Sequence, residues 1–162
     1  NLLPRLTAVE NLALPLIYAG MKKKERTEKA MAMLDLVSLG DRSHHKPNEL
    51  SGGQCQRVAI ARALVNDPSL ILADEPIASL DPKNARMVLT QLLELVRERG
   101  VPLLLSLHHL DVVRTYADRV VAIKGGRLFY DGPPSGLTPE VEAALYFGEG
   151  LEGGEEVPAL SA

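Results

Sequence analysis

Apolar positions follow a helical period in the first part of the chain. An i, i+3, i+4, i+7 stripe predicts an amphipathic helix that ends near Gly40. Before it, Thr7 and Glu10 have the spacing of a capping box, in which each side chain satisfies a free backbone N–H. This spacing predicts a helix from about Ala8, which Pro15 kinks or ends. The stripe consists of Ala30, Met33, Leu34 and Val37.

After about residue 68 the pattern changes to short, continuous apolar runs that have the length of buried strands. Residues 82–99, between the first two runs, begin with Pro and are followed by Gly, which is typical of a helix. Residues 110–117 predict further helical turns, and Gly125-Gly126 predicts a hairpin turn. Strands that alternate with helices favour an α/β fold with a mostly parallel sheet. The three runs are residues 70–73, 103–107 and 120–123.

Composition and charge narrow the function classes. Hydrophobic residues make up 46% of the chain and charged residues 24%, which is the balance of a globular protein. Because Cys55 is the only cysteine, a disulfide framework and a cysteine-built zinc site are excluded. Cys55 itself is expected to be an inert helix residue. The net charge of -3 argues against nucleic acid as a partner. The longest apolar stretch, residues 12–21, is too short to cross a membrane. Residues 148–162 contain four Glu and no Lys or Arg, and predict a flexible acidic tail.

The first candidate site is residues 50–54, Leu-Ser-Gly-Gly-Gln, ahead of a helical run. Ser51 can cap that helix, and Gly52 and Gly53 let backbone N–H groups approach a ligand closely. Because a helix N-terminus attracts anions, the segment is a candidate phosphate site. Taken alone, it is more often an ordinary loop-to-helix cap.

The second candidate site follows the strand at 70–73, where Asp74 and Glu75 place two carboxylates at the strand end. Asp74 can hold Mg²⁺ through its waters, and Glu75 can orient and polarise an attacking water. Ligands of parallel sheets bind beyond the carboxyl ends of strands, and His108 occupies a second such end.

These features, in this order, resemble the ATP-binding-cassette (ABC) ATPases. Residues 50–54 match the signature motif of that family, and residues 70–75 match its Walker B strand with the catalytic Glu. Residues 78–81 match the D-loop. His108 matches the switch histidine; His109 competes for this role, but the alignment of His-His-Leu-Asp favours His108.

The resemblance covers about residues 1–147 and implies a P-loop NTPase-like fold with a mostly parallel sheet and a helical subdomain. Residues 1–58 would be the helical subdomain with the signature motif. Residues 59–147 would be the C-terminal part of the ATPase core, and residues 148–162 the tail.

The resemblance also implies ATP and Mg²⁺ as cofactors, trapped between two cassettes that associate head to tail. The signature residues would bind the nucleotide held by the other cassette, with Ser51, Gly53 and Gln54 at the γ-phosphate. Gly52 belongs to the same nucleotide-binding set.

The remaining site residues would act on the nucleotide or across the dimer. Asp74 would hold Mg²⁺, and Glu75 would polarise the attacking water. His108 would contact the γ-phosphate and stabilise developing charge. Asp81 would work across the dimer interface and link the two sites.

One part of the family pattern is absent from the sequence. No segment reads G-x-x-x-x-G-K-[ST], the phosphate-binding Walker A loop. The adenine-stacking aromatic and the Q-loop Gln would also lie upstream of Asn1. The chain therefore reads as the C-terminal two-thirds of a cassette whose N-terminal strands are missing. It is expected to be inactive alone, with the apolar faces of residues 70–73 and 103–107 partly exposed.

The family implies the energy-coupling ATPase of a bacterial ABC transporter, peripheral at the cytoplasmic face of the inner membrane. Its partners would be a second cassette and transmembrane permease subunits. Residues 1–16 resemble lipoprotein-release and macrolide-export ATPases, whereas residues 74–82 and 130–134 resemble phosphonate-import ATPases, so the cargo stays open. The alternatives are an ABC ATPase without a transport role and a non-catalytic cassette fragment that only associates with a partner.

Overall fold

The computed structural model of the chain describes residues 2–148. The chain divides into two compact units, Asn1–Ser106 and Leu107–Ala162. Apart from Gly148, the predicted acidic tail lies outside the described residues. In residues 2–148, no helix combines the length and the apolar character that crossing a membrane would need.

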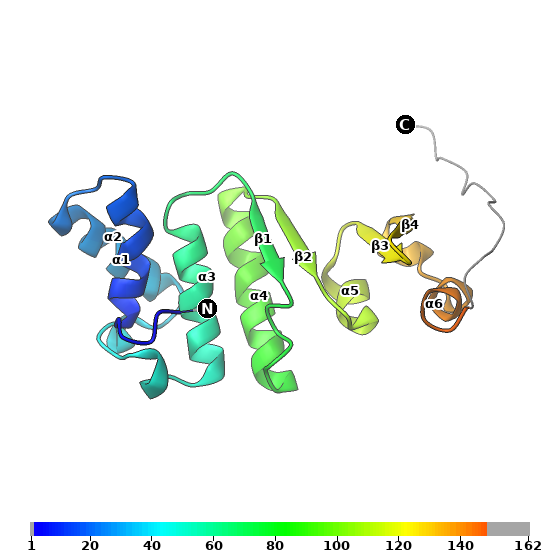
Figure 1. The fold of residues 1–162 in the computed structure, drawn as a ribbon, viewed down its shortest axis with the longest axis horizontal. Helices are drawn as coiled ribbons and strands as arrows, with labels where there is room; N and C mark the ends of the chain where they lie inside the picture. The colour runs from blue at the N-terminus through cyan, green and yellow to red at the C-terminus, as the bar shows by residue number, and fades with distance from the viewer. Residues whose placement is uncertain (1, 149–162) are drawn as a thin grey trace. The chain divides into compact units, whose positions relative to one another are not determined.

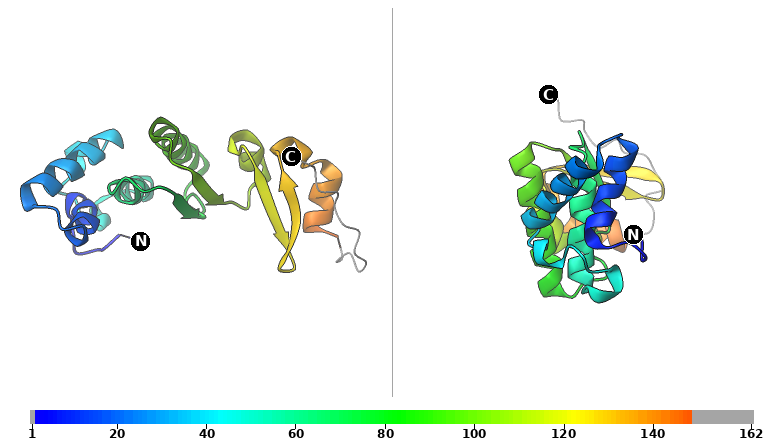
Figure 2. Two further views of the ribbon diagram at one scale, coloured as in Figure 1. Left: turned by 90° about the horizontal axis from the view of Figure 1, so that it is seen from above. Right: turned by 90° about the vertical axis from the view of Figure 1, so that its left-hand side faces the viewer.

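Three helices begin the first unit: α1 (Ala8–Tyr18), α2 (Lys23–Leu36) and α3 (Gly52–Leu64). They pack against one another (Figure 1; Figure 2, left). Two short 3₁₀ turns, Gly40–Arg42 and Pro47–Glu49, lie between α2 and α3. The predicted apolar stripe is buried, which confirms the helix inferred from its spacing, although α2 ends at Leu36 rather than near Gly40 and Val37 is its C-cap. The bundle core includes the fully buried side chains of Leu12, Leu16, Leu34, Val37, Val58 and Leu64.

Helix α1 begins where the capping box predicted. Thr7 Oγ1 accepts the Glu10 N–H at 3.3 Å, and Glu10 Oε2 accepts the Thr7 N–H at 2.8 Å. Pro15 does not end the helix, which continues to Tyr18. Leu16 in the following turn is fully buried, so packing of that turn offsets the hydrogen bond that proline removes.

A buried amide organises the segment before α1. The Asn11 side chain is 0% exposed. Its Oδ1 accepts the Leu3 N–H at 2.8 Å, and its Nδ2 donates to the carbonyls of Leu3, Leu6 and Thr7 at 3.2, 3.1 and 3.0 Å. One side chain thus satisfies the backbone of an irregular turn, which would otherwise carry unpaired polar groups.

Two parallel strands follow α3: β1 (Ile71–Asp74) and β2 (Leu103–Ser106). Helix α4 (Pro82–Arg99) connects them and packs against α3. Both the strands and the connecting helix agree with the sequence pattern. Gly100 ends α4 in the left-handed region at φ +62°, which glycine adopts without a steric penalty.

The β1–β2 pair has one covered and one exposed face. In the parallel register Ile71 pairs with Leu103, and Leu72 pairs with Leu104. Ile71 is buried, whereas Leu72 is 70% exposed and Leu104 is 63% exposed. The predicted exposure of apolar sheet positions is therefore confirmed.

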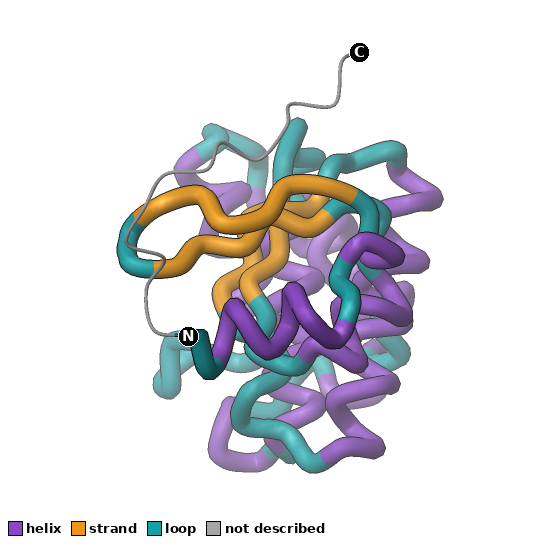
Figure 3. Tube along the Cα trace, turned by 90° about the vertical axis from the view of Figure 1, so that its right-hand side faces the viewer, coloured by secondary structure: helices purple, strands orange, loops and turns teal. Residues whose placement is uncertain are grey.

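The second unit is built around an antiparallel hairpin of β3 (Val120–Lys124) and β4 (Arg127–Gly132). Figure 3 shows the two strands side by side, joined by a short turn. Gly125 and Gly126 form this turn with positive φ angles of 57° and 74°, as their sequence predicted. The unit also contains α5 (Leu110–Tyr116), a 3₁₀ turn (Pro134–Gly136) and α6 (Pro139–Tyr146).

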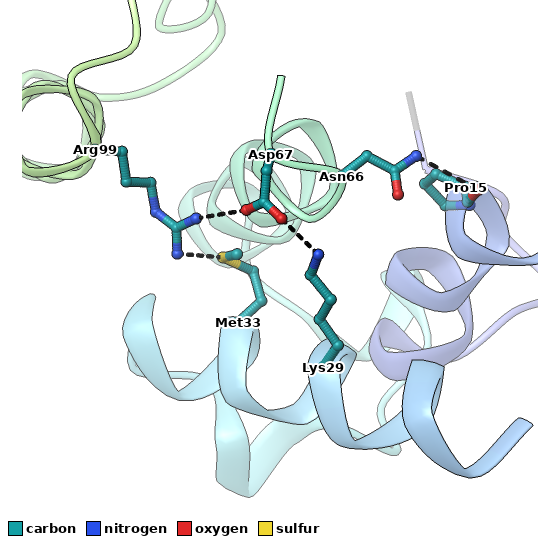
Figure 4. Close-up of polar contacts among 6 residues, drawn as sticks. All are labelled: Pro15, Lys29, Met33, Asn66, Asp67 and Arg99. Carbon is teal, nitrogen blue, oxygen red and sulfur yellow. Dashed lines mark hydrogen bonds and ion pairs between the residues drawn. The ribbon is translucent and has the colours of Figure 1, made fainter. Parts of the chain in front are cut away.

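An ionic cluster around Asp67 ties elements of the first unit together (Figure 4). Asp67, after α3, accepts from Lys29 of α2 at 2.6 Å and from Arg99 of α4 at 3.2 Å. Arg99 also reaches the Met33 sulfur at 3.8 Å. The Lys29 hydrogen bond, followed by the charges of Lys29 and Arg99, lowers the pKa of Asp67.

Candidate functional site

The signature segment forms the N-terminus of α3. Ser51 is the N-cap: its Oγ accepts the Gln54 N–H at 3.3 Å, and its own N–H donates to Gln54 Oε1 at 2.8 Å. This reciprocal pair is a capping box, which satisfies two backbone donors and leaves further N–H groups of the first turn pointing out of the helix. Ser51 and Gly52 are exposed. The arrangement can bind an anion such as a phosphate.

The structure brings the signature glycines against the D-loop segment and the first turn of α4 that follows it. A Cβ at Gly52 would lie 3.5 Å from Leu80 Cδ2. A Cβ at Gly53 would lie 3.2 Å from Asn84 Oδ1. The two motifs are 24 or more positions apart in sequence, and the packing of α3 on α4 makes them neighbours.

Asp81 is the N-cap of α4. Its Oδ1 accepts the N–H groups of Lys83 and Asn84, both at 3.1 Å, and its Oδ2 accepts from Asn84 Nδ2 at 2.5 Å. These bonds, first of all the one from the Asn84 side chain, lower the pKa of Asp81. The carboxylate is exposed and stays ionised at neutral pH.

Asp74 and Glu75 stand at the carboxyl end of β1, and Ser106 at the end of β2 joins them. The parallel register sets Ser106 beside Asp74. The Ser106 hydroxyl donates to Asp74 Oδ1 at 2.6 Å and accepts the Glu75 N–H at 3.0 Å. Glu75 has a φ of 44°, an uncommon backbone region for a residue with a side chain. One hydroxyl therefore holds both a carboxylate and the strained turn that follows it.

Ser106 and Asn84 are site residues that the sequence reasoning missed. The signal for Ser106 was its place at the end of the second buried run, which parallel pairing sets next to Asp74. No sequence signal pointed to Asn84, because its contact with Gly53 depends on the packing of two helices.

His108 belongs to the second unit. Its side chain is exposed, and its carbonyl accepts from the Tyr146 hydroxyl at 3.1 Å. His109, the competing position, is the N-cap residue of α5 and makes no side-chain cap hydrogen bond.

Cys55, in the first turn of α3, behaves as expected of an inert thiol. Its sulfur lies 3.4 Å from the Pro47 carbonyl oxygen, and burial raises its pKa. A raised pKa lowers the fraction of reactive thiolate at neutral pH.

The residues around Asp74 fit a magnesium ion held mainly by other ligands. Within residues 2–148 there is no group of three or more His, Cys, Asp or Glu residues that could hold a metal ion. Asp74 instead offers one exposed carboxylate with a hydroxyl beside it. Mg²⁺ commonly takes one or two carboxylates and completes its shell with water and phosphate oxygens, so this donor set suits it.

Comparison with known proteins identifies the family of the segment that contains the signature residues and the strand-end carboxylates. Residues 1–78 match the family described as ABC transporter. Residues 1–78 therefore belong to the ABC transporter family. This matched part contains Ser51 to Gln54 as well as Asp74 and Glu75.

Curated relatives of this ABC transporter segment extend the similarity beyond residue 78. A phosphonates import ATP-binding protein of Synechococcus sp. is 49% identical over 157 residues, covering 92% of this chain and 60% of that protein. A lipoprotein-releasing system ATP-binding protein of Hyphomonas neptunium is 45% identical over 128 residues, covering 79% of this chain and 56% of that protein. The chain thus resembles both groups that the sequence suggested, and it spans little more than half the length of these relatives.

A solved ABC cassette has the same fold. It is a dimeric ATP-binding cassette in a post-hydrolysis state bound to ADP and Pi, with 40% identity and a TM-score of 0.70. The match covers 83% of this chain and 59% of the other. The α/β, P-loop NTPase-like class is therefore confirmed.

Proposed function

We propose that the chain is part of the ATP-binding and ATP-hydrolysing subunit of a bacterial ABC transporter, which powers substrate transport across the inner membrane. The observation that carries this proposal is the Asp74–Ser106–Glu75 cluster at the end of a parallel strand, in the unit that also presents the signature helix N-terminus. The match of residues 1–78 to the ABC transporter family supports the same conclusion.

The signature segment would bind the γ-phosphate of a nucleotide held by a second cassette. Ser51, Gly53 and Gln54 would contact that phosphate, and Gly52 would allow its close approach. The support is chemical: the first turn of α3 presents N–H groups and the positive end of the helix dipole. A dimeric cassette among the structural relatives is consistent with such a partner.

The strand-end residues would carry out the chemistry. Asp74 would hold Mg²⁺, which, when bound, offsets phosphate charge. Glu75 would act as the general base that orients and polarises the attacking water. His108 would contact the γ-phosphate and stabilise the charge that develops there. Asp81 would link the two nucleotide sites across the dimer interface.

The membrane context rests on the relatives. Relatives named as a phosphonates import ATP-binding protein and a lipoprotein-releasing system ATP-binding protein support a permease partner and a place at the cytoplasmic face of the inner membrane. Because relatives with different cargoes match about equally well, the proposal includes no cargo.

The 162 residues by themselves should hydrolyse no appreciable ATP, because the sequence contains no G-x-x-x-x-G-K-[ST] loop to hold the nucleotide. Hydrolysis is proposed for the complete cassette. A non-catalytic fragment that only associates with a partner is the alternative.

Glu75→Gln in the complete, permease-assembled cassette tests the catalytic role. Removing a general base should lower turnover by about 10²-fold or more while nucleotide stays bound. Steady-state phosphate release and retention of labelled ATP measure the two effects. The matched control is Glu98→Gln, the same change at an exposed position of α4, which should leave turnover unchanged. Survival of turnover in Glu75→Gln would refute the general-base role, whereas a complete parent cassette without turnover would favour the non-catalytic alternative.

A further inference from the structure

Asn84 touches two motifs that the proposed function treats as separate parts. It lies in the first turn of α4 and is half-buried. One side of its amide group meets the signature glycine Gly53, and the other side meets Asp81. The side chain therefore lies between the phosphate-binding segment and the carboxylate proposed to act across the dimer interface.

The contact with Gly53 is close and specific to glycine. Gly53 is buried, and a Cβ built on it would lie 3.2 Å from Asn84 Oδ1, 3.4 Å from its Cγ and 3.5 Å from its Cβ. A methyl group at Gly53 would have to move the Asn84 amide. The backbone of the signature turn thus rests directly on this side chain.

The contact with Asp81 orients the same amide. Asn84 Nδ2 donates to Asp81 Oδ2 at 2.5 Å, while the Asn84 N–H donates to Oδ1 at 3.1 Å. Because the donor nitrogen faces Asp81, the oxygen faces Gly53. Displacing the amide at either end must disturb the other.

We propose that Asn84 is a positioning residue that couples the signature turn to the D-loop within one cassette, by holding the Asp81 carboxylate with its amide nitrogen and supporting the Gly53 backbone. This inference rests on the proposed function, since it assumes that both motifs act on nucleotide. It adds a residue whose effect on turnover passes through Gly53 and Asp81 rather than through contact with ATP.

The test is a set of double-mutant cycles in the complete, permease-assembled cassette. Asn84→Ala should lower kcat about fivefold with KM for ATP unchanged within about twofold, a coupling of the size found between residues in contact. Asp81→Ala should lower kcat in the parent, and Asn84→Ala should add little to the loss when Asp81→Ala is already present, because the carboxylate that Asn84 holds is gone. Gly53→Ala should be less harmful in the Asn84→Ala background, because the crowded amide is gone.

Controls separate this role from a loss of stability. Lys83→Ala, at the exposed neighbour in the same helical turn, should leave kcat unchanged. Asn84→Asp keeps the shape of the side chain but sets a second carboxylate against Asp81, so kcat should fall. The thermal midpoint of unfolding should be maintained, because a negative charge in the first turn of α4 stabilises the helix.

Two outcomes would overturn the proposal: losses from Asn84→Ala and Asp81→Ala that simply multiply, or Asn84 variants as active as Lys83→Ala. Either result, with Glu75→Gln still inactive, would refute the positioning role of Asn84 and leave the proposed ATPase function intact. Turnover that survives Glu75→Gln would instead refute the general-base role of Glu75, and a complete parent cassette without turnover would refute the ATPase proposal itself.

Discussion

At the scale of single residues, Ser106 shows how a small side chain completes a site. Its hydroxyl donates to Asp74 and accepts from the N–H of Glu75, whose backbone is in the left-handed region. A residue held in a sparsely populated conformation depends on its surroundings to stay there. Asp74 and Glu75 could be recognised from their order after an apolar run. Ser106 could not, because its role depends on a neighbouring strand.

Ser106→Ala should lower the turnover of the complete cassette about tenfold with KM for ATP nearly unchanged, because the Glu75 turn loses its hydrogen bond. Unfolding should show a loss of only about 1 kcal/mol, the usual net contribution of one hydrogen bond. Ser106→Thr retains the hydroxyl and suits a strand, so it should restore most of the activity. Equal losses in both variants would show that the hydroxyl does not position Glu75.

At the scale of elements, side-chain bonds at helix ends join pieces that are distant in sequence. Arg57 of α3 donates to the Val37 carbonyl at 2.9 Å, and Gln91 of α4 donates to the Leu36 carbonyl at 3.3 Å. Both bonds cover the C-terminus of α2, where backbone carbonyls lack partners within the helix. The Asp67 cluster links α2 and α4 in a similar way (Figure 4).

Asp67→Asn should lower the free energy of unfolding of the chain by about 1 kcal/mol at pH 7, the upper range for exposed ion pairs. Asn tolerates the left-handed backbone of Asp67, at φ 50°, so the variant removes charge without adding strain. The folded-state pKa of Asp67 is lowered, so its contribution is present above the unfolded pKa of about 4 and is lost as the pH falls through the folded value.

Denaturant unfolding of both proteins from about pH 7 to pH 2 measures this contribution, with low and high salt compared because screening weakens exposed pairs. The two stability curves should converge at the acid end. A difference that persists unchanged at the lowest pH would show that the Lys29 and Arg99 pairs are not its source.

At the scale of the whole chain, one face of β1–β2 is an apolar sheet surface that the described fold leaves uncovered. Leu72 and Leu104 pair across the two strands and are both largely exposed. Adjacent exposed leucines on a sheet favour association with other apolar surfaces. The apolar runs predicted buried strands, but whether both faces are covered depends on what packs against them.

The 162-residue chain should therefore self-associate, and Leu72→Gln together with Leu104→Gln should weaken this association about tenfold. Sedimentation velocity over a concentration series measures the change. The control is Tyr18→Gln, which removes an apolar side chain of 84% exposure from the end of α1 and should leave the association as it was. A parent chain that stays monomeric at every concentration contradicts the prediction.

The sequence by itself determined the local features of this protein. Capping residues, helical stripes and short apolar runs predicted α1, α2, α4 and the strands, because those signals act over a few residues. The signature segment, Asp74, Glu75, Asp81 and His108 were predicted as site residues from their order along the chain and from the resemblance of that order to the ABC ATPases. Tertiary structure decided that α1 continues past Pro15, that Ser106 bridges Asp74 and Glu75, and that Asn84 lies between Gly53 and Asp81. These outcomes depend on packing and strand pairing between distant segments, which no local pattern specifies.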